Sequence, residues 1–115
     1  MANKITGNRG EEIACGYLKK SGYTIINRNV RFSRICELDI IALDRNKTLV
    51  AVEVKTRKNE KLGSPLEAIT PQKYTNIKSG LYNYASEHSE YKKIRIDVIA
   101  IVLEPEIKIT HLKNI

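Results

Sequence analysis

The sequence predicts an α/β fold in which helices flank a mixed central sheet of about five strands. Three observations support this expectation. The expected elements run in the order helix, three strands, helix, strand, strand. The segment 94–102 is apolar along both faces, as in a central strand covered on both sides. The chain has 115 residues, 42% of them hydrophobic, so one domain spanning residues 1–115 is expected.

The two expected helices rest on apolar periodicity and on residues typical of helix ends. The first, over 8–21, carries apolar residues at helical spacing, and Gly22 follows where a C-terminal cap belongs. The second, over 71–88, begins with Pro71 after the N-cap residue Thr70, and an apolar stripe runs along it.

The expected strands are rich in β-branched and aliphatic residues and are separated by polar turn residues. The fourth strand follows a helix, so a right-handed crossover to a parallel neighbour is expected. A short last strand follows Pro105. The five segments are 23–32, 36–44, 48–56, 94–102 and 106–112.

Charge and composition narrow the classes of function. With 42% hydrophobic and 29% charged residues, the composition is that of an ordinary globular domain and excludes global disorder. Lys and Arg number 20 against 13 Asp and Glu, which gives a net charge of +7. The basic balance favours a polyanionic partner, although a soluble protein can be basic without one.

Two cysteines and the first residues of the chain indicate the compartment. Cys15 and Cys36 lack the spacing of a zinc site and are expected to be buried reduced thiols. The N-terminal residues lack the apolar core of a secretory signal, and no stretch approaches the ~20 apolar residues of a membrane span. A cytoplasmic protein with no membrane partner is expected.

Charged residues interrupt two otherwise apolar strands. Glu37 and Asp39 share one face of the second strand with apolar residues, and Glu53 and Lys55 emerge together from the third. A three-residue hairpin loop over 45–47, with its central residue near the left-handed region, sets Asp39 opposite Glu53 and Glu37 opposite Lys55. A slip of one residue would mismatch the two faces. Asp39 and Glu53 should therefore be neighbours, with Cβ atoms ~4.5–5.5 Å apart.

Two neighbouring carboxylates call for a positive group. At ~4 Å they repel by ~4 kcal/mol at an effective dielectric of ~20. Lys55 supplies part of the compensation, and hard oxygen ligands with an open face also suit Mg²⁺ or Mn²⁺. The alternative is a cross-strand salt-bridge ladder on a solvated face of the sheet.

Other polar residues have simpler expected roles. Glu11 lies on the flank of the first helix's apolar stripe and can reach the sheet, whereas Glu12 lies on the wet side; both could instead favour the helix N-terminus. Asp97, in an apolar strand, is expected in a structural ion pair and not in catalysis. His88 and His111 lack mutual metal spacing and are expected at the surface or at an edge.

Asp39 followed by Glu53-Val54-Lys55 resembles the D…(D/E)-x-K signature of the restriction-endonuclease-like, or PD-(D/E)-x-K, nuclease fold. The surrounding sequence is more specific and resembles the YraN family of small bacterial proteins, similar to archaeal Holliday-junction resolvases, over nearly the whole chain. Cys36 and Val30 depart from the family pattern, where Gly and an aromatic residue are usual. The matching segments are Gly7-Asn8-Arg9-Gly10-Glu11-Glu12-Ile13-Ala14, Glu37-Leu38-Asp39-Ile40-Ile41-Ala42, Val52-Glu53-Val54-Lys55-Thr56-Arg57, Gly63-Ser64-Pro65-Leu66-Glu67-Ala68-Ile69, Pro71-Gln72-Lys73 and Asp97-Val98-Ile99-Ala100.

The resemblance implies a metal-dependent endonuclease that hydrolyses phosphodiester bonds in DNA, with branched or junction DNA as a candidate, Mg²⁺ or Mn²⁺ as the cofactor and a homodimer suited to such a substrate. The alternative is a non-catalytic nucleic-acid-binding or adaptor protein that keeps the fold. The implied catalytic residues are Glu11, Asp39, Glu53, Lys55 and Lys73, and the implied metal ligands are Asp39, Glu53, the Val54 carbonyl and Glu11. Lys73 could equally be a solvated residue of a first helical turn.

Basic residues flank the acidic strands and suit contacts to a phosphate backbone, with recognition of shape and not of sequence. A solvated surface loop is the alternative for the second group of them. These residues are Arg28, Arg31, Arg34, Arg57, Lys58 and Lys61.

Overall fold

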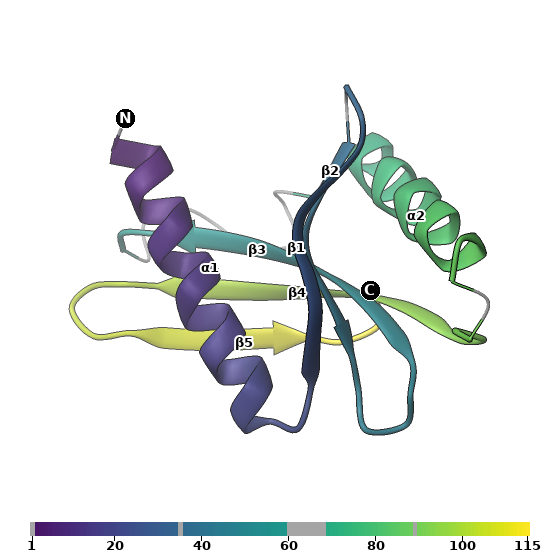
Figure 1. Ribbon diagram of the computed structural model, residues 1–115. Helices are drawn as coiled ribbons and strands as arrows, with labels where there is room; N and C mark the ends of the chain where they lie inside the picture. Colours follow the sequence, from purple (N-terminus) through teal and green to yellow (C-terminus); the bar gives the residue numbers. More distant parts are fainter. Residues whose placement is uncertain (1, 35, 60–68, 89) are drawn as a thin grey trace.

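The computed structural model describes residues 2–34, 36–59, 69–88 and 90–115, with side chains described from residue 8 onward. It confirms the α/β class, with a mixed sheet of five strands in the order β1-β2-β3-β4-β5 and a helix on each face (Figure 1). β3 and β4 are parallel, as the crossover predicted, and the other pairs are antiparallel. The elements are α1 (Ala2–Lys20), β1 (Thr24–Ser33), β2 (Cys36–Leu43), β3 (Leu49–Arg57), α2 (Pro71–Ser86), β4 (Ile94–Val102) and β5 (Lys108–Leu112).

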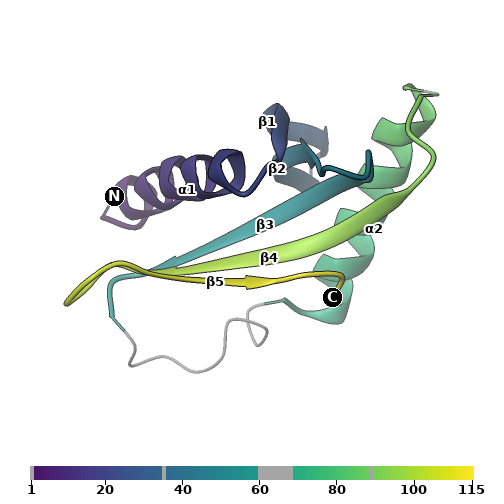
Figure 2. The same cartoon turned by 90° about the horizontal axis from the view of Figure 1, so that it is seen from below.

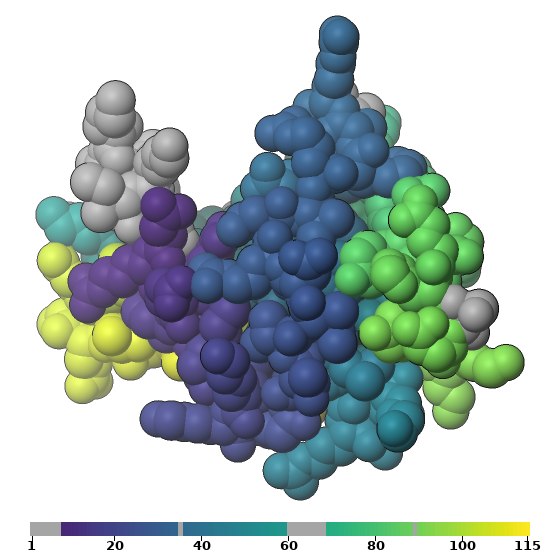
Figure 3. Space-filling model, in the orientation of Figure 1, coloured from purple at the N-terminus to yellow at the C-terminus, as the bar shows by residue number. Residues whose placement is uncertain are grey.

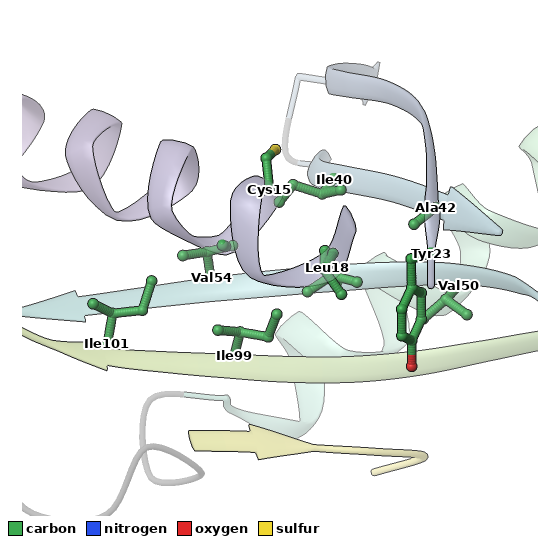
Figure 4. Packing of buried hydrophobic residues seen from close by; sticks show 11 residues of the cluster. Cys15, Leu18, Tyr23, Ile40, Ala42, Val50, Val54, Ile99 and Ile101 are labelled. Atoms are coloured by element: carbon green, nitrogen blue, oxygen red, sulfur yellow. The ribbon is translucent and has the colours of Figure 1, made fainter. Parts of the chain in front are cut away.

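The sheet carries one apolar cluster on each face. α1 crosses one face, where Cys15 and Leu18 lie among sheet residues such as Val54 and Ile99 (Figures 2 and 4). α2 covers the other face, where Leu81 is fully buried. Both cysteines are free and buried, as expected. No helix in the described part of the chain is long and apolar enough to cross a membrane.

Capping residues mark the end of α1 and the start of α2. α1 begins at Ala2, earlier than the predicted residue 8, and Gly22 closes it in the left-handed conformation with φ 93°. The Tyr23 amide donates to the Leu18 carbonyl at 2.9 Å, which completes a Schellman-type cap. α2 begins at Pro71, and the hydroxyl of the N-cap residue Thr70 accepts from the Lys73 amide at 3.1 Å.

A glycine sets the distance between α1 and the sheet. Gly10 is buried, and a Cβ added there would lie 1.7 Å from Oγ1 of Thr56 on β3. Only a residue without a side chain allows this approach, because real Cβ atoms do not come so close to another heavy atom. Gly10 therefore fixes how deeply the first half of α1 sits on β3, the strand that also carries Glu53.

The hairpin between β2 and β3 has the predicted register. Leu43 pairs with Leu49, and the ladder runs to the pair of Ile40 and Val52. The left-handed residue of the loop is Lys47, with φ 65°, and not the central Asn46 that the sequence suggested. The reason is Asp44, whose Oδ1 accepts from the amides of Asn46 and Thr48 and so holds the first part of the loop.

A buried polar network lies on the α1 face of β4. Asp97 is fully buried and accepts hydrogen bonds from Arg95 Nε at 2.8 Å and from the Asn114 amide at 3.0 Å. Its Oδ2 lies 2.7 Å from His111 Nε2. The structural role predicted for Asp97 is confirmed. His111 was expected at the surface or at an edge, and it is on the edge strand β5; its side chain is only 5% exposed because it turns inward to Asp97.

Candidate metal and catalytic site

The candidate site forms where β2 leaves β3. The ladder between them ends at Ile40 and Val52, although both strands continue, and β2 bends away from β3 toward α2 (Figure 1). Asp39 is the next residue, and its Oδ2 accepts a hydrogen bond from the Val54 amide at 2.9 Å. The carboxylate thus satisfies an amide of β3 at a point where the pairing with β2 has already ended. This bond fixes Asp39 beside Glu53.

Glu53 is the acidic centre of the site. Its side chain is only 6% exposed, and residues 49–54 of its strand are all buried. Lys73 Nζ lies 2.7 Å from Glu53 Oε1, and Lys55 Nζ lies 3.7 Å from the same oxygen. Lys73 belongs to the first turn of α2, so the Thr70 cap that starts this helix also aims its ammonium group at the sheet. Three elements, β2, β3 and α2, therefore converge.

Burial and a neighbouring negative charge perturb the Asp39 carboxylate. Burial, followed by the negative charge of Glu53, raises the pKa of Asp39 from 3.8 to about 7, against the lowering effect of the Val54 amide. The neighbouring ammonium groups do not cancel this effect. Asp39 therefore keeps its proton to a higher pH than an ordinary aspartate does.

The two lysines respond in opposite directions. Burial and the nearby Lys73 lower the pKa of Lys55, and the carboxylates of Glu53 and Asp39 oppose this only in part. For Lys73, burial acts to lower the pKa, but the hydrogen bonds to Glu53 and Lys55 and the negative charges of Glu53 and Asp39 together outweigh burial, and the pKa is raised. Lys73 is thus the permanent ammonium group, and Lys55 is the amine that loses its proton more readily.

Glu11 lies beside this cluster without joining it. Its side chain is 17% exposed, and an oxygen lies 4.0 Å from the Arg28 guanidinium, which also holds Glu12 at 2.6 Å. Burial is the main cause that raises the pKa of Glu11, and a hydrogen bond with Asn29 opposes it. Glu12 is 68% exposed, as its position on the wet side predicted. The metal role implied for Glu11 stays a prediction.

The residues at the site suit a hard divalent cation. Asp39 and Glu53 offer carboxylate oxygens from adjacent strands, and a cation bound between them would offset the burial and the charge of Glu53 that together raise the pKa of Asp39. The Lys73 ammonium beside Glu53 already marks a place for positive charge. Among the residues that the structure describes, no three His, Cys, Asp or Glu side chains gather closely enough to hold a metal alone. Water, substrate phosphate and main-chain oxygens such as the Val54 carbonyl would complete the shell.

The position expected for Glu37 is wrong. Glu37 was expected opposite Lys55, but the β2–β3 ladder stops before that pair. Glu37 instead pairs with Arg31 of β1, 3.5 Å away, because β2 stays paired with β1 after it leaves β3. Glu37 therefore belongs to the β1–β2 hairpin and not to the acidic cluster.

The residues expected to contact phosphate are in mixed environments. Arg28 is engaged by Glu12 and Glu11, and Arg31 by Glu37. Arg57 has an interaction within the chain. Arg34 and Lys58 are exposed. Lys61 lies outside the described residues.

Two neighbours of the site escaped the sequence reasoning. Arg28 was assigned to phosphate, yet it bridges β1 to the acidic residues of α1. Asn29 has φ 52° and a side chain bonded to Glu11. An asparagine inside a strand pattern is a signal for a left-handed residue, and this one could have been found from the sequence.

Fold and site together define an α/β protein in which a half-buried and a buried carboxylate meet two lysines at a strand fork. The model of the Uncharacterised protein family UPF0102 matches residues 10–101, and the chain belongs to this family. The match confirms the resemblance to the YraN family, and the resemblance to the nuclease fold stays a prediction. A UPF0102 protein of Syntrophomonas wolfei is 40% identical over 114 residues, covering 97% of each chain. A UPF0102 protein of Desulforamulus reducens is 38% identical, and the match covers 100% of this chain and 95% of the relative. A UPF0102 protein of Trichlorobacter lovleyi is 40% identical, and the match covers 97% of this chain and 90% of the relative.

Proposed function

We propose that this protein is a metal-dependent nuclease of the restriction-endonuclease-like class that hydrolyses phosphodiester bonds in DNA, branched DNA included. One observation supports the proposal above all others. The half-buried carboxylate of Asp39 and the buried carboxylate of Glu53 meet at a strand fork, with Lys55 and Lys73 within 3.7 Å of the same Glu53 oxygen. Hard acidic ligands next to a lysine of perturbed pKa suit the metal-assisted hydrolysis of a phosphodiester.

Asp39 and Glu53 would hold the divalent ion, with the Val54 carbonyl as a further ligand. A bound Mg²⁺ or Mn²⁺ supplies a water of lowered pKa and neutralises charge on the scissile phosphate. The Val54 amide keeps the Asp39 carboxylate in place through its 2.9 Å bond. Glu11, in the electrostatic field of Asp39, would hold a water of the metal shell.

The lysines divide the remaining tasks. Lys55 would take a proton from the attacking water, because burial and Lys73 make its neutral amine more accessible than that of an ordinary lysine. Lys73 would stay charged and stabilise the negative charge that develops on the phosphate oxygens. The structure thus supports different roles for two residues of the same type.

Charge supports nucleic acid as the substrate. The net charge is +7, and exposed cations such as Arg34 and Lys58 lie on the segments that flank the acidic strands. Phosphate contacts of this kind fix position on a backbone and carry no sequence information. Recognition by shape is therefore expected.

A cleavage screen tests the proposal. Metal-free protein is incubated with duplex, flap, single-stranded and four-way DNA, with and without Mn²⁺ or Mg²⁺. Products should appear only with the cation and should vanish in Asp39→Asn and Glu53→Gln. Glu106→Gln is the matched control, because Glu106 is an exposed acid outside the cluster, and it should cleave as wild type does. Wild-type protein that binds these DNAs and leaves all of them intact would refute the proposal.

The second candidate is a non-catalytic nucleic-acid-binding protein that keeps the cluster for stability. The 2.7 Å pair between Lys73 and Glu53 favours it, because an ammonium group there already neutralises the carboxylate. Binding would then survive Asp39→Asn and Glu53→Gln and would not depend on a divalent cation. The same screen separates the two candidates if binding is recorded beside cleavage.

A further inference from the structure

Exposed cations gather at the end of the sheet away from the candidate site. This end holds the last turn of α1, the β2–β3 loop and the segment that leads into β4. In the space-filling view, the end of α1 and the β2–β3 loop lie along the same edge of the molecule (Figure 3). We call these residues the basic edge. All six are exposed: Lys19, Lys20, Arg45, Lys47, Lys92 and Lys93.

Contacts of the backbone bring these cations together. A Cβ added at Gly22, directly after α1, would lie 2.0 Å from Arg45 Nε, so the Arg45 side chain lies against the turn that follows Lys19 and Lys20. At the other side of the loop, the Leu49 amide donates to the Lys93 carbonyl at 2.8 Å. The three segments that carry the basic edge are therefore neighbours in space, although they are far apart in the sequence.

The cations of the basic edge are not neutralised within the described part of the chain. None of the six takes part in an ion pair there, whereas Arg28 and Arg31, near the candidate site, both do. Asp44, the acid of the same loop, is turned inward. Its Oδ2 lies 2.9 Å from Arg95, and its side chain is 11% exposed.

We infer that the basic edge is a second phosphate-binding surface, which holds nucleic-acid backbone at a distance from the carboxylate cluster. At a rise of ~3.3 Å per residue, Leu49 and Glu53 are about 13 Å apart along β3, and the basic edge begins beyond Leu49. A duplex carries a phosphate about every 3.4 Å along each strand. A nucleic acid that contacts both the carboxylate cluster and the basic edge must therefore extend over several base pairs. A branched nucleic acid could instead contact the basic edge with a second helical arm.

This inference rests on the proposed function only in taking nucleic acid as the partner. The regular spacing of a phosphate backbone suits cations distributed along an edge. A simpler role exists for Lys19 and Lys20, since cations in the last turn of a helix favour its dipole by ~0.3–1 kcal/mol. That role does not extend to Arg45 and Lys47, which belong to a β-hairpin loop, so it does not account for the surface as a whole.

The test compares two variants that each lose three positive charges. Lys20→Gln/Arg45→Gln/Lys47→Asn removes three positive charges from the basic edge. Asparagine is chosen at residue 47 because it tolerates the left-handed backbone there. Lys78→Gln/Lys108→Gln/Lys113→Gln removes exposed cations elsewhere. Affinity for a duplex of about 30 base pairs is measured by fluorescence anisotropy in EDTA between about 50 and 200 mM salt, the range where phosphate contacts dominate. Thermal melting checks that both variants fold, and Arg45→Gln alone serves as a milder variant.

The basic-edge variant should bind at least about tenfold more weakly than the control variant, with a log–log salt slope less steep by about 0.9 for each phosphate that the protein no longer neutralises. Equal losses in both variants would show a general effect of net charge and overturn the inference. The inference would also be overturned if the basic-edge variant bound DNA as wild type does but bound anionic phospholipid vesicles more weakly. That result would make the basic edge a membrane-facing surface. Cleavage is scored separately: loss of binding without any nuclease activity in wild type would uphold the inference and refute only the proposed catalysis.

Discussion

Asp39 joins structure and chemistry in one side chain. Its Oδ2 accepts from the Val54 amide where β2 and β3 part, and its position beside Glu53 raises its pKa to about 7. A carboxylate in this place costs stability whenever it is charged, because burial and Glu53 both favour the protonated form. A structural role alone would be served better by a neutral side chain.

Asp39→Asn should therefore stabilise the metal-free protein above pH 7. In the wild type, the folded state holds a proton between about pH 4 and 7 that the unfolded state has released, so stability falls as pH rises through this window. Asparagine keeps the acceptor for Val54 and removes the titration, with a gain on the order of 1–3 kcal/mol. Urea denaturation in EDTA across this range measures it. An equal pH dependence in variant and wild type would contradict the assignment.

Lys73→Gln tests the competition between ammonium and metal at Glu53. The ammonium group lies 2.7 Å from Glu53 Oε1, so its removal should raise the affinity for Mn²⁺ because the carboxylate is no longer shared. Cleavage should fall at the same time, by ~10- to 1000-fold, since a charge that stabilises the reacting phosphate is removed. Affinity is measured by calorimetry, and the rate is measured at saturating Mn²⁺. Lys78→Gln, an exposed lysine on the same helix, is the control and should change neither.

Part of this residue-scale picture was predictable. The alternation of faces and the short loop placed Asp39 beside Glu53, since only even offsets keep both apolar faces matched. The contact of Lys73 with Glu53 depends on where α2 lies over the sheet, and no local pattern encodes that position. The inward turn of His111 escaped prediction for the same reason, because its partner Asp97 is on another strand.

At the scale of elements, the packing of α1 on β3 depends on one residue without a side chain. Gly10→Ala would place a Cβ 1.7 Å from Thr56 Oγ1, so α1 must shift away from β3. The expected cost is ~1–3 kcal/mol in the free energy of unfolding. Gly16→Ala is the matched control in the same helix: nothing lies within 4 Å of its Cβ, so it should be neutral or stabilise by up to ~1 kcal/mol. Equal effects of the two substitutions would contradict the close approach.

The elements were predicted better than their ends. Capping residues located Gly22 and Pro71 correctly, because caps act through local hydrogen bonds. The start of α1 was placed six residues too late, since its first residues lack apolar periodicity. The end of the β2–β3 ladder was missed as well. The bend of β2 away from β3 is a tertiary effect, and it separates Glu37 from the cluster while leaving Asp39 in it.

At the scale of the molecule, the Asp97 network ties distant segments together. Arg95 connects Asp97 with Asp44 of the β2–β3 loop and with the Tyr23 hydroxyl at the start of β1. Burial acts to raise the pKa of Asp97, but hydrogen bonds from His111 and Arg95 outweigh it and lower the pKa. The stability from this carboxylate is therefore present above its ordinary pKa of 3.8 and is lost as pH falls below it.

Arg95→Met should destabilise the protein by ~3–5 kcal/mol, because it leaves a fully buried carboxylate without its guanidinium. The midpoint of urea denaturation at neutral pH measures the loss. Arg34→Met changes an exposed arginine in the same way and should stay within ~0.5 kcal/mol of wild type. A small effect at Arg95 would mean that His111 and the Asn114 amide satisfy Asp97 without it.

The whole-molecule prediction from the sequence was sound because the order of elements and the doubly apolar fourth strand restrict the topology to few solutions. The parallel pairing of β3 with β4 followed from the crossover helix alone. The gathering of cations into a basic edge did not follow, because it requires the turn after α1, the β2–β3 loop and the approach to β4 to meet at one end of the sheet.

Binding of Mn²⁺ to the metal-free protein, followed by isothermal titration calorimetry, tests the central claim most directly. Wild type should show saturable binding, and Asp39→Asn and Glu53→Gln should each abolish it while melting as folded proteins. Glu106→Gln should bind as wild type does. Binding that is absent in wild type, or equal in wild type and the two cluster variants, would contradict a cation site at the fork of β2 and β3.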